Sequence, residues 1–195
     1  MSNIEVRKMI KIGDEIPEME TDAFADTELK KLNLKDYRGK WIILAFYPAD
    51  FTFVCPTELE ELAELHGEFK KEGAEIMSVS TDTNFTHLAW HDSSPAIGRV
   101  KYPMLADPSG KLCNYFGTYI EDEGVSLRAT FIIDPEGKVK SIHIHDNSIS
   151  RKAAEILRQL RAAKYVYENP GEVCPASWEP GSETLKPGAD LVGKI

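Results

Sequence analysis

The chain contains three cysteines that could do covalent chemistry: Cys55, Cys113 and Cys174. None of them belongs to a C-x-x-C pair, so the sequence favours neither a zinc ribbon nor a dithiol redox motif. An odd number of cysteines argues against a framework of structural disulfides and for a reducing compartment. The three thiols are therefore isolated groups, and each serves either packing or chemistry.

Cys55 lies where chemistry is favoured. It follows an apolar segment, residues 41–47, that Pro48 terminates, and Pro56 suits the first turn of a helix that begins there. Free N–H groups and the positive end of the helix dipole favour a thiolate at such a position. A thiol that only fills space needs neither a helix N-terminus nor a threonine three residues upstream. We therefore expect Cys55 to be a nucleophile.

Three neighbours of Cys55 in the sequence could support it. Thr52 carries a hydroxyl that can accept and donate near the sulfur, and Pro48 would shield the sulfur from bulk water. Glu58, one helical turn on, serves either as a capping-box carboxylate or as the partner of a cation beside the thiolate. Each residue also has an ordinary structural explanation when it is taken alone.

The elements that must position these residues follow an α/β pattern. Residues 41–47 read as a central strand buried on both faces, and a helix from Cys55 to Gly73 leads to a parallel strand at 74–81. Further elements are predicted from periodicity and turn chemistry: a short helix at 84–91, type I turns at 107–110 and 134–137, a hairpin of 129–134 with 139–145, and an amphipathic helix from 150 to about 167. The predicted order is β-α-β, a helix, then β-β-α.

From Asn169 onward prolines and glycines interrupt any regular element, so we expect an arm that lies over another surface or is mobile. A length of 195 residues suits one domain. We assign residues 1–168 to that domain and residues 169–195, with Cys174, to the arm.

Composition excludes several function classes. With 32 acidic and 23 basic side chains the net charge is −9, which disfavours binding to nucleic acid or to anionic membranes. No apolar run approaches the ~20 residues that span a bilayer. The first residues include no apolar stretch of the secretory type, so we expect a cytoplasmic protein.

Four separated segments resemble, in order, those of the peroxiredoxins. Pro48-x-x-x-Thr52-x-x-Cys55 is similar to their peroxidatic motif, and the likeness extends over nearly the whole chain through FYPADFTFVCPTE, STDTNFTHLAWH, RATFIIDPEGKV and NPGEVCPA. The sequence is most similar to typical two-cysteine peroxiredoxins of the bacterial alkyl hydroperoxide reductase type. The resemblance implies a thioredoxin-like α/β fold, with a central mixed β-sheet flanked by helices and an irregular C-terminal arm.

The resemblance also implies an activity, the thiol-dependent reduction of hydrogen peroxide and organic hydroperoxides. Cys55 would be the peroxidatic cysteine, whose thiolate attacks the peroxide and becomes a sulfenic acid. Arg128 would place a permanent positive charge beside the sulfur, and Thr52 would help to hold the peroxide oxygens in line. Cys174 would be the resolving cysteine, which attacks the sulfenic acid of Cys55 on a partner chain.

Partners follow from the same resemblance. It implies a homodimer with an intersubunit Cys55–Cys174 disulfide and a decamer of five dimers, with Thr86 near the contact between dimers. Electrons would come from a flavin-containing disulfide reductase or from thioredoxin, and the role would be antioxidant defence and redox homeostasis. We expect the chain to bind no cofactor and no metal.

Two alternatives stay open at this point. A thioredoxin-like dithiol oxidoreductase shares the element order but needs C-x-x-C where this chain has Cys55-Pro-Thr-Glu. A ring-forming holdase chaperone is compatible with the resemblance and could coexist with catalysis.

The remaining reactive side chains are interpreted as structural. Cys113 is expected to be a partly buried packing thiol. His87 and His91 have the i, i+4 spacing of helical metal ligands but lack the adjacent glutamate of a metalloprotease. His143 and His145 share one strand face without a third ligand, and Trp90 either packs in the core or lines the site entrance.

Overall fold

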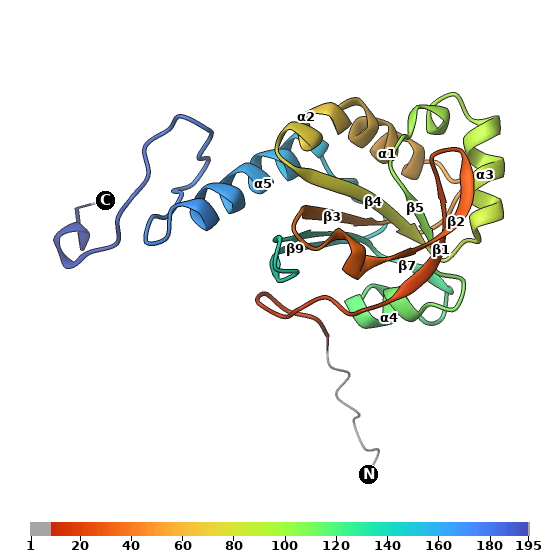
Figure 1. The fold of residues 1–195 in the computed structure, drawn as a ribbon, viewed down its shortest axis with the longest axis horizontal. Helices are drawn as coiled ribbons and strands as arrows, with labels where there is room; N and C mark the ends of the chain where they lie inside the picture. Colours follow the sequence, from red (N-terminus) through yellow and green to blue (C-terminus); the bar gives the residue numbers. More distant parts are fainter. Residues whose placement is uncertain (1–8, 195) are drawn as a thin grey trace, which may run out of the picture. The chain divides into compact units, whose positions relative to one another are not determined.

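The computed structural model describes residues 9–194. Seven strands form a mixed sheet in the order β2-β1-β5-β4-β3-β8-β9, and two short strands form a separate hairpin (Figure 1). The strands of the large sheet are β1 (Glu20–Ala25), β2 (Glu28–Asn33), β3 (Trp41–Phe46), β4 (Ala74–Ser80), β5 (Met104–Ala106), β8 (Arg128–Ile133) and β9 (Val139–His145), and the hairpin is β6 (Tyr119–Ile120) with β7 (Val125–Ser126).

Helices flank this sheet on both faces: in Figure 1, α1 and α2 run along one face and α4 along the other. The α-helices are α1 (Cys55–Glu64), α2 (His66–Lys71), α3 (Asn84–Ser93), α4 (Lys111–Phe116) and α5 (Ala153–Glu168), and the 3-10 helices are η1 (Leu34–Tyr37), η2 (Ile97–Arg99) and η3 (Ala189–Leu191). Within residues 9–194, no helix is long and apolar enough to cross a membrane.

Strand β3 lies inside the sheet and organises it. It pairs in parallel with β4 through the α1–α2 crossover, and it pairs antiparallel with β8. The hairpin of β8 and β9 is closed at 134–137, where the Gly137 N–H donates to the Asp134 carbonyl at 2.8 Å. The predicted β-α-β unit, the hairpin and the fully buried central strand are therefore confirmed.

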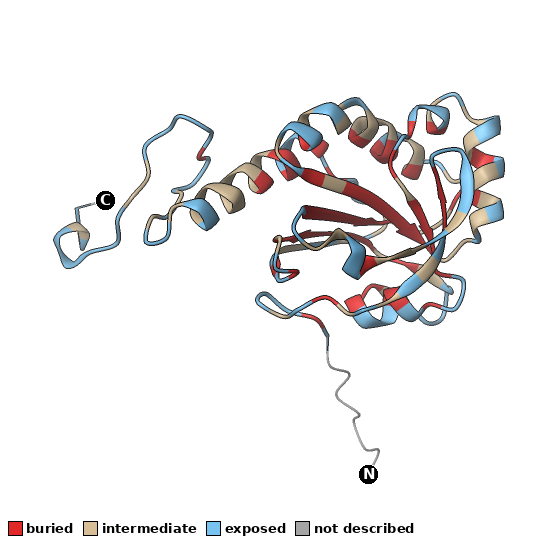
Figure 2. Ribbon diagram, in the orientation of Figure 1, coloured by how far each residue is buried: buried red, intermediate tan, exposed pale blue. Residues whose placement is uncertain are grey.

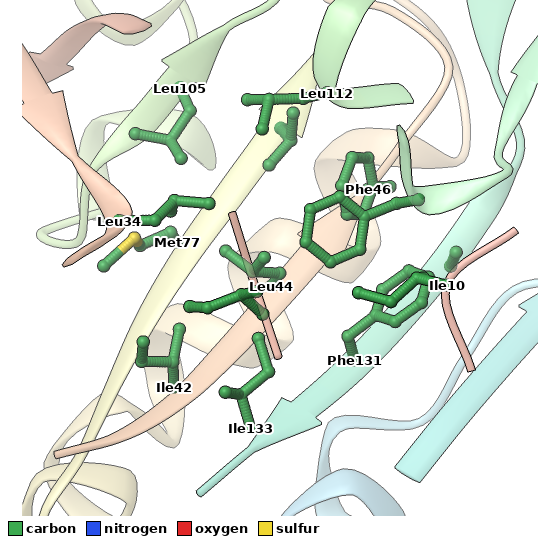
Figure 3. Close-up of a cluster of buried hydrophobic side chains, with 14 of the residues drawn as sticks. Ile10, Leu34, Ile42, Leu44, Phe46, Met77, Leu105, Leu112, Phe131 and Ile133 are labelled. Atoms are coloured by element: carbon green, nitrogen blue, oxygen red, sulfur yellow. The ribbon is translucent and has the colours of Figure 1, made fainter. Parts of the chain in front are cut away.

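Side chains that alternate between the two faces of the sheet build the core. Ile42, Leu44 and Phe46 of β3 are fully buried on the face that α4 covers, together with Phe131 and Ile133 of β8 (Figure 3). Buried residues are concentrated in the central strands of the sheet (Figure 2). Tight packing on both faces fixes the carboxyl end of β3, from which the segment that leads to Cys55 departs.

Sequence reasoning missed some elements and merged others. The hairpin of β1 and β2, the short strand β5 and helix α4 were not expected. The predicted helix from Cys55 to Gly73 is divided at Leu65, whose φ of −91° and ψ of 1° leave the helical region. Gly67, a weak helix former, lies two residues after the break.

By compactness the chain separates into two units, one that ends at Ala153 and one that begins at Ala154. In the second unit the segment after α5 folds onto residues of that same helix. The Trp178 ring packs 5.1 Å from the Tyr165 ring, between ring centres, and the Trp178 carbonyl accepts from Arg158 Nη1 at 3.0 Å. The arm is thus ordered by local contacts. The assignment of residues 1–168 and 169–195, of which 1–8 and 195 lie outside the described residues, remains a prediction.

Replacing Leu44 by Ala should lower the free energy of unfolding by about 2–5 kcal/mol, because it leaves a cavity in the fully buried strand β3. Leu29→Ala is the matched control: Leu29 lies on the edge strand β2 with 38% of its surface exposed, and its loss should cost less than about 1 kcal/mol. Urea unfolding of both variants measures the difference. Equal losses would contradict the assignment of the core.

Candidate active site

Cys55 is the first residue of α1, and its side chain is fully buried. It follows the carboxyl end of β3 through the segment 47–54, and Pro56 occupies the first turn of the helix. Phe51 in this segment has a φ of 56°, a left-handed conformation that is rare for a phenylalanine. The segment is thus a constrained turn that places the sulfur at the start of the helix.

Arg128, the first residue of β8, reaches the sulfur from the neighbouring strand. Its Nη1 donates to Cys55 Sγ at 3.4 Å and to Glu58 Oε2 at 2.8 Å. Burial alone would lower the pKa of the Arg128 guanidinium, but the hydrogen bond to Cys55 and the charge of Glu58 raise it above its ordinary value. The cation therefore stays charged while it lies against the sulfur.

Glu58 is 2% exposed and binds a second arginine, Arg151. The Arg151 backbone N–H donates to Glu58 Oε1 at 2.9 Å, and Arg151 Nη2 donates to Glu58 Oε2 at 3.1 Å. Arg151 also donates to the carbonyl oxygens of Ala129 and Phe46, both at 2.6 Å. One carboxylate thus joins two buried guanidinium groups across α1, β3 and β8.

The capping-box interpretation of Glu58 is wrong. The residue before α1, Val54, makes no side-chain capping bond, and both Glu58 oxygens are taken by arginines. Because both oxygens are already bound by Arg128 and Arg151, neither is available to cap the start of α1.

Arg151 was missed by the sequence analysis. One signal was available: Arg151 lies in the first turn of the helix predicted from residue 150, at the positive end of the dipole, where a cation is disfavoured unless a carboxylate compensates it.

Thr52 and Pro48 are half-buried residues of the segment that precedes α1. The Thr52 hydroxyl donates to the Ala49 carbonyl at 2.8 Å, which closes the turn before Cys55. The hydroxyl oxygen keeps its lone pairs for a further donor. Its expected contact with a peroxide, and the shielding expected of Pro48, remain predictions.

A network of buried polar groups holds the segment 47–54 in place through hydrogen bonds. Asp50 accepts from the Tyr47 hydroxyl at 2.7 Å and lies 2.7 Å from His87 Nδ1, and its backbone N–H donates to Asp82 at 2.8 Å. Burial raises the pKa of the Asp50 carboxyl, although its hydrogen bond to His87 opposes the shift. His87 is therefore engaged in the interior and is not available as the metal ligand considered from its spacing.

Within residues 9–194, no group of three or more His, Cys, Asp or Glu side chains is placed to hold a metal ion. Trp90 is 3% exposed and packs against Tyr47 and Phe51, with ring centres 6.2 and 5.9 Å apart. It is both a core residue and a support of the Cys55 segment.

The other two cysteines lie in contrasting environments. Cys113 is fully buried in α4, and burial, followed by the charge of Asp107, raises the pKa of its thiol to about 12. Cys174 is half-buried in the second unit, where its Sγ lies 3.9 Å from the Ala162 carbonyl oxygen. Burial raises the pKa of the Cys174 thiol, and the positive charge of Arg158 opposes the shift. Cys113 is thus the packing thiol that was expected, buried more completely than predicted.

Comparison with known proteins shows the family of this chain. A family model described as the AhpC/TSA family matches residues 12–142. The chain belongs to the AhpC/TSA family. It is 46% identical over 187 residues to the alkyl hydroperoxide reductase C of Pseudomonas aeruginosa, covering 96% of this chain and 100% of that one. It is 49% identical over 188 residues to the protein of that name from Amphibacillus xylanus, with the same coverage.

Solved structures agree with this membership. The AhpC of Enterococcus faecalis superimposes with a TM-score of 0.83 at 44% identity, covering 86% of this chain and 100% of that chain. The reduced 2-Cys peroxiredoxin of Plasmodium vivax gives a TM-score of 0.87 at 34% identity, covering 92% and 94%. This AhpC/TSA family member therefore has the predicted thioredoxin-like fold, and the expectation of a thiol-dependent peroxidase of the peroxiredoxin type is confirmed.

Replacing Glu58 by Ala in this family member should lower the free energy of unfolding by about 3–5 kcal/mol, because two buried guanidinium groups lose their shared counter-charge. Glu64→Ala, on the same helix, removes an exposed carboxylate that lies 3.7 Å from Arg99 and should cost at most about 1 kcal/mol. Chemical denaturation distinguishes the two variants. If both lose the same free energy, the bridge does not organise the site.

Proposed function

We propose that Cys55 is the peroxidatic cysteine of this thiol-dependent peroxidase, and that it reduces hydrogen peroxide and organic hydroperoxides. The observation that carries the proposal is the position of Arg128 Nη1, which donates at once to Cys55 Sγ at 3.4 Å and to Glu58 at 2.8 Å. A permanent cation held beside a buried sulfur stabilises the thiolate and also the charge that develops on a departing oxygen.

The first step follows from this geometry. The Cys55 thiolate attacks the terminal oxygen of the peroxide, a sulfur–oxygen bond forms and the O–O bond breaks. The departing oxygen takes up a proton and leaves as an alcohol or as water, and Cys55 becomes a sulfenic acid. In this scheme Arg128, whose Nη1 donates to Cys55 Sγ, stabilises the negative charge as it moves from the sulfur to the leaving oxygen.

In the second step Cys174 resolves the sulfenic acid. Its thiol sulfur bonds to the Cys55 sulfur of a partner chain, the hydroxyl of the sulfenic acid leaves as water, and a disulfide remains. A disulfide requires Cα atoms within ~7 Å, so the first turn of α1, where Cys55 is fully buried, must open. Two electrons and two protons from a reductant then restore both thiols.

The partners belong to the same proposal. The reductant is a disulfide reductase, of the flavin-containing type or thioredoxin, and the compartment is the cytoplasm. The assembly is a homodimer that forms a decamer of five dimers. Exposed aromatic side chains support further assembly: Phe53 beside Cys55 is 94% exposed and Phe85 on α3 is 68% exposed, and an interface would cover them.

Cys55→Ser should abolish peroxide consumption, because the nucleophile is removed. Cys174→Ser should still consume one equivalent of peroxide per chain but lose turnover with a disulfide reductant.

Cys113→Ser is the matched control and should stay within about twofold of the wild type, because a buried thiol with a pKa of about 12 takes no part at neutral pH. Peroxide-consumption assays and non-reducing gels measure these outcomes. Turnover by Cys55→Ser, or the absence of a linked dimer in oxidised wild type, would refute the scheme.

The disulfide step should accelerate with pH. Burial raises the pKa of Cys174, so the resolving thiol is protonated at neutral pH and its reactive thiolate increases about tenfold per pH unit below that pKa. Stopped-flow traces from pH 6 to 9, begun with one equivalent of peroxide, resolve this step from the first. A disulfide step that slows as the pH rises would contradict the expected protonation state.

A further inference from the structure

The loop that follows β9 turns back over the end of β8. The two strands pair antiparallel with Arg128 opposite His145, where β9 ends. The Asp146 side-chain Oδ1 then accepts from the Ser148 backbone N–H at 2.8 Å, and the Asp146 backbone carbonyl accepts from the Ile149 N–H at 2.9 Å. These turn bonds leave Asn147, which is not part of the strand pairing, beside the first residue of β8.

Asn147 makes three contacts with this end of β8. Its side-chain Oδ1 accepts from the Arg128 backbone N–H at 3.1 Å, and its Nδ2 donates to the Ser126 carbonyl at 3.4 Å. The side-chain amide thus bridges the main chain on either side of Leu127, as the polar groups of an adjacent strand would. The third contact comes from its backbone: the Asn147 carbonyl accepts from Arg128 Nε at 2.9 Å.

The third contact orients the guanidinium. The group is planar and rigid, so an acceptor on Nε and an acceptor on Nη1 together fix its plane. Nε is held by the Asn147 carbonyl, while Nη1 faces Cys55 Sγ and Glu58 Oε2. The carbonyl lies there because the side-chain amide of the same residue is attached to β8.

We propose that Asn147 is a positioning residue for Arg128: its side chain anchors the loop to β8, so that its carbonyl holds the Arg128 guanidinium against the sulfur of Cys55. The inference rests on the proposed function, in which Arg128 stabilises the thiolate and the leaving oxygen.

The test is a double-mutant cycle on the second-order rate constant for oxidation of Cys55 by hydrogen peroxide, measured by stopped flow. Asn147→Ala should lower this constant about tenfold and Arg128→Ala roughly a hundredfold, since loss of a charge-stabilising donor costs more than its displacement. In the Arg128→Ala background the Asn147→Ala change should have almost no further effect, because its target is gone.

Two more measurements separate positioning from loss of structure. The rate of Cys55 alkylation by iodoacetate, relative to neutral iodoacetamide, should fall in Asn147→Ala, because a displaced guanidinium attracts the anion less. Asn147→Asp keeps the acceptor for the Arg128 N–H at the same length and should fold and retain more of the oxidation rate than Asn147→Ala. Asn33→Ala is the control: Asn33 ends the edge strand β2, and its side chain accepts from the Lys35 backbone N–H in η1, so its loss should leave the oxidation rate unchanged.

The outcomes are distinguishable. An Asn147→Ala enzyme within twofold of the wild type, beside an impaired Arg128→Ala enzyme, would overturn the inference and leave the proposed function intact. A further tenfold loss in the Arg128→Ala background would also overturn it, because Asn147 would then act independently. An unimpaired Arg128→Ala enzyme would overturn the role of Arg128 itself, and the inference with it.

Discussion

The site depends on one interaction, the double ion pair of the Glu58 carboxylate with Arg128 and Arg151. Two guanidinium groups and the Cys55 sulfur, which carries negative charge under the proposed function, lie within one buried region, and both cations are largely shielded from solvent. Glu58 compensates one of the two positive charges, which leaves a net cation beside Cys55. The site is thus electrostatically balanced for an anionic sulfur, and the same bridge joins α1, β8 and the loop before α5.

The parts of the fold that sequence reasoning predicted are those whose pattern is set by local chemistry. Strand β3 could be predicted because every residue in it is apolar. The Asp134-Pro-Glu-Gly137 turn could be predicted because proline and glycine fix its dihedral angles. Strands β1 and β2 could not be predicted, since their charged and apolar residues show no sustained alternation and β2 lies at the sheet edge with largely exposed side chains. Strand β5 has three residues, too few for any periodicity.

The candidate site shows the same division. Thr52, Cys55 and Glu58 belong to one short segment, so spacing alone linked them. Arg128 came only through the family resemblance, because nothing in its local sequence separates it from a solvated arginine. Arg151 and Asn147 join the site because the chain after β9 returns to β8 and α1, and local sequence does not specify these long-range contacts. The position of Arg151 at the start of a predicted helix indicated only that it needs a carboxylate partner, without identifying Glu58. For the same reason the sequence could not decide whether Glu58 caps the helix or pairs with a cation, since that depends on where its partners lie.

The complete burial of Cys113 has a consequence for the lifetime of the protein. In the folded state burial shields this thiol from solvent and raises its pKa, but global unfolding exposes it together with Cys55. In the presence of peroxide, unfolded chains are then oxidised or cross-linked through a thiol that the native fold cannot accommodate in oxidised form. Where this oxidation outpaces refolding, unfolding becomes irreversible, and the durability of the protein is then set by the height of the unfolding barrier and not by the equilibrium free energy.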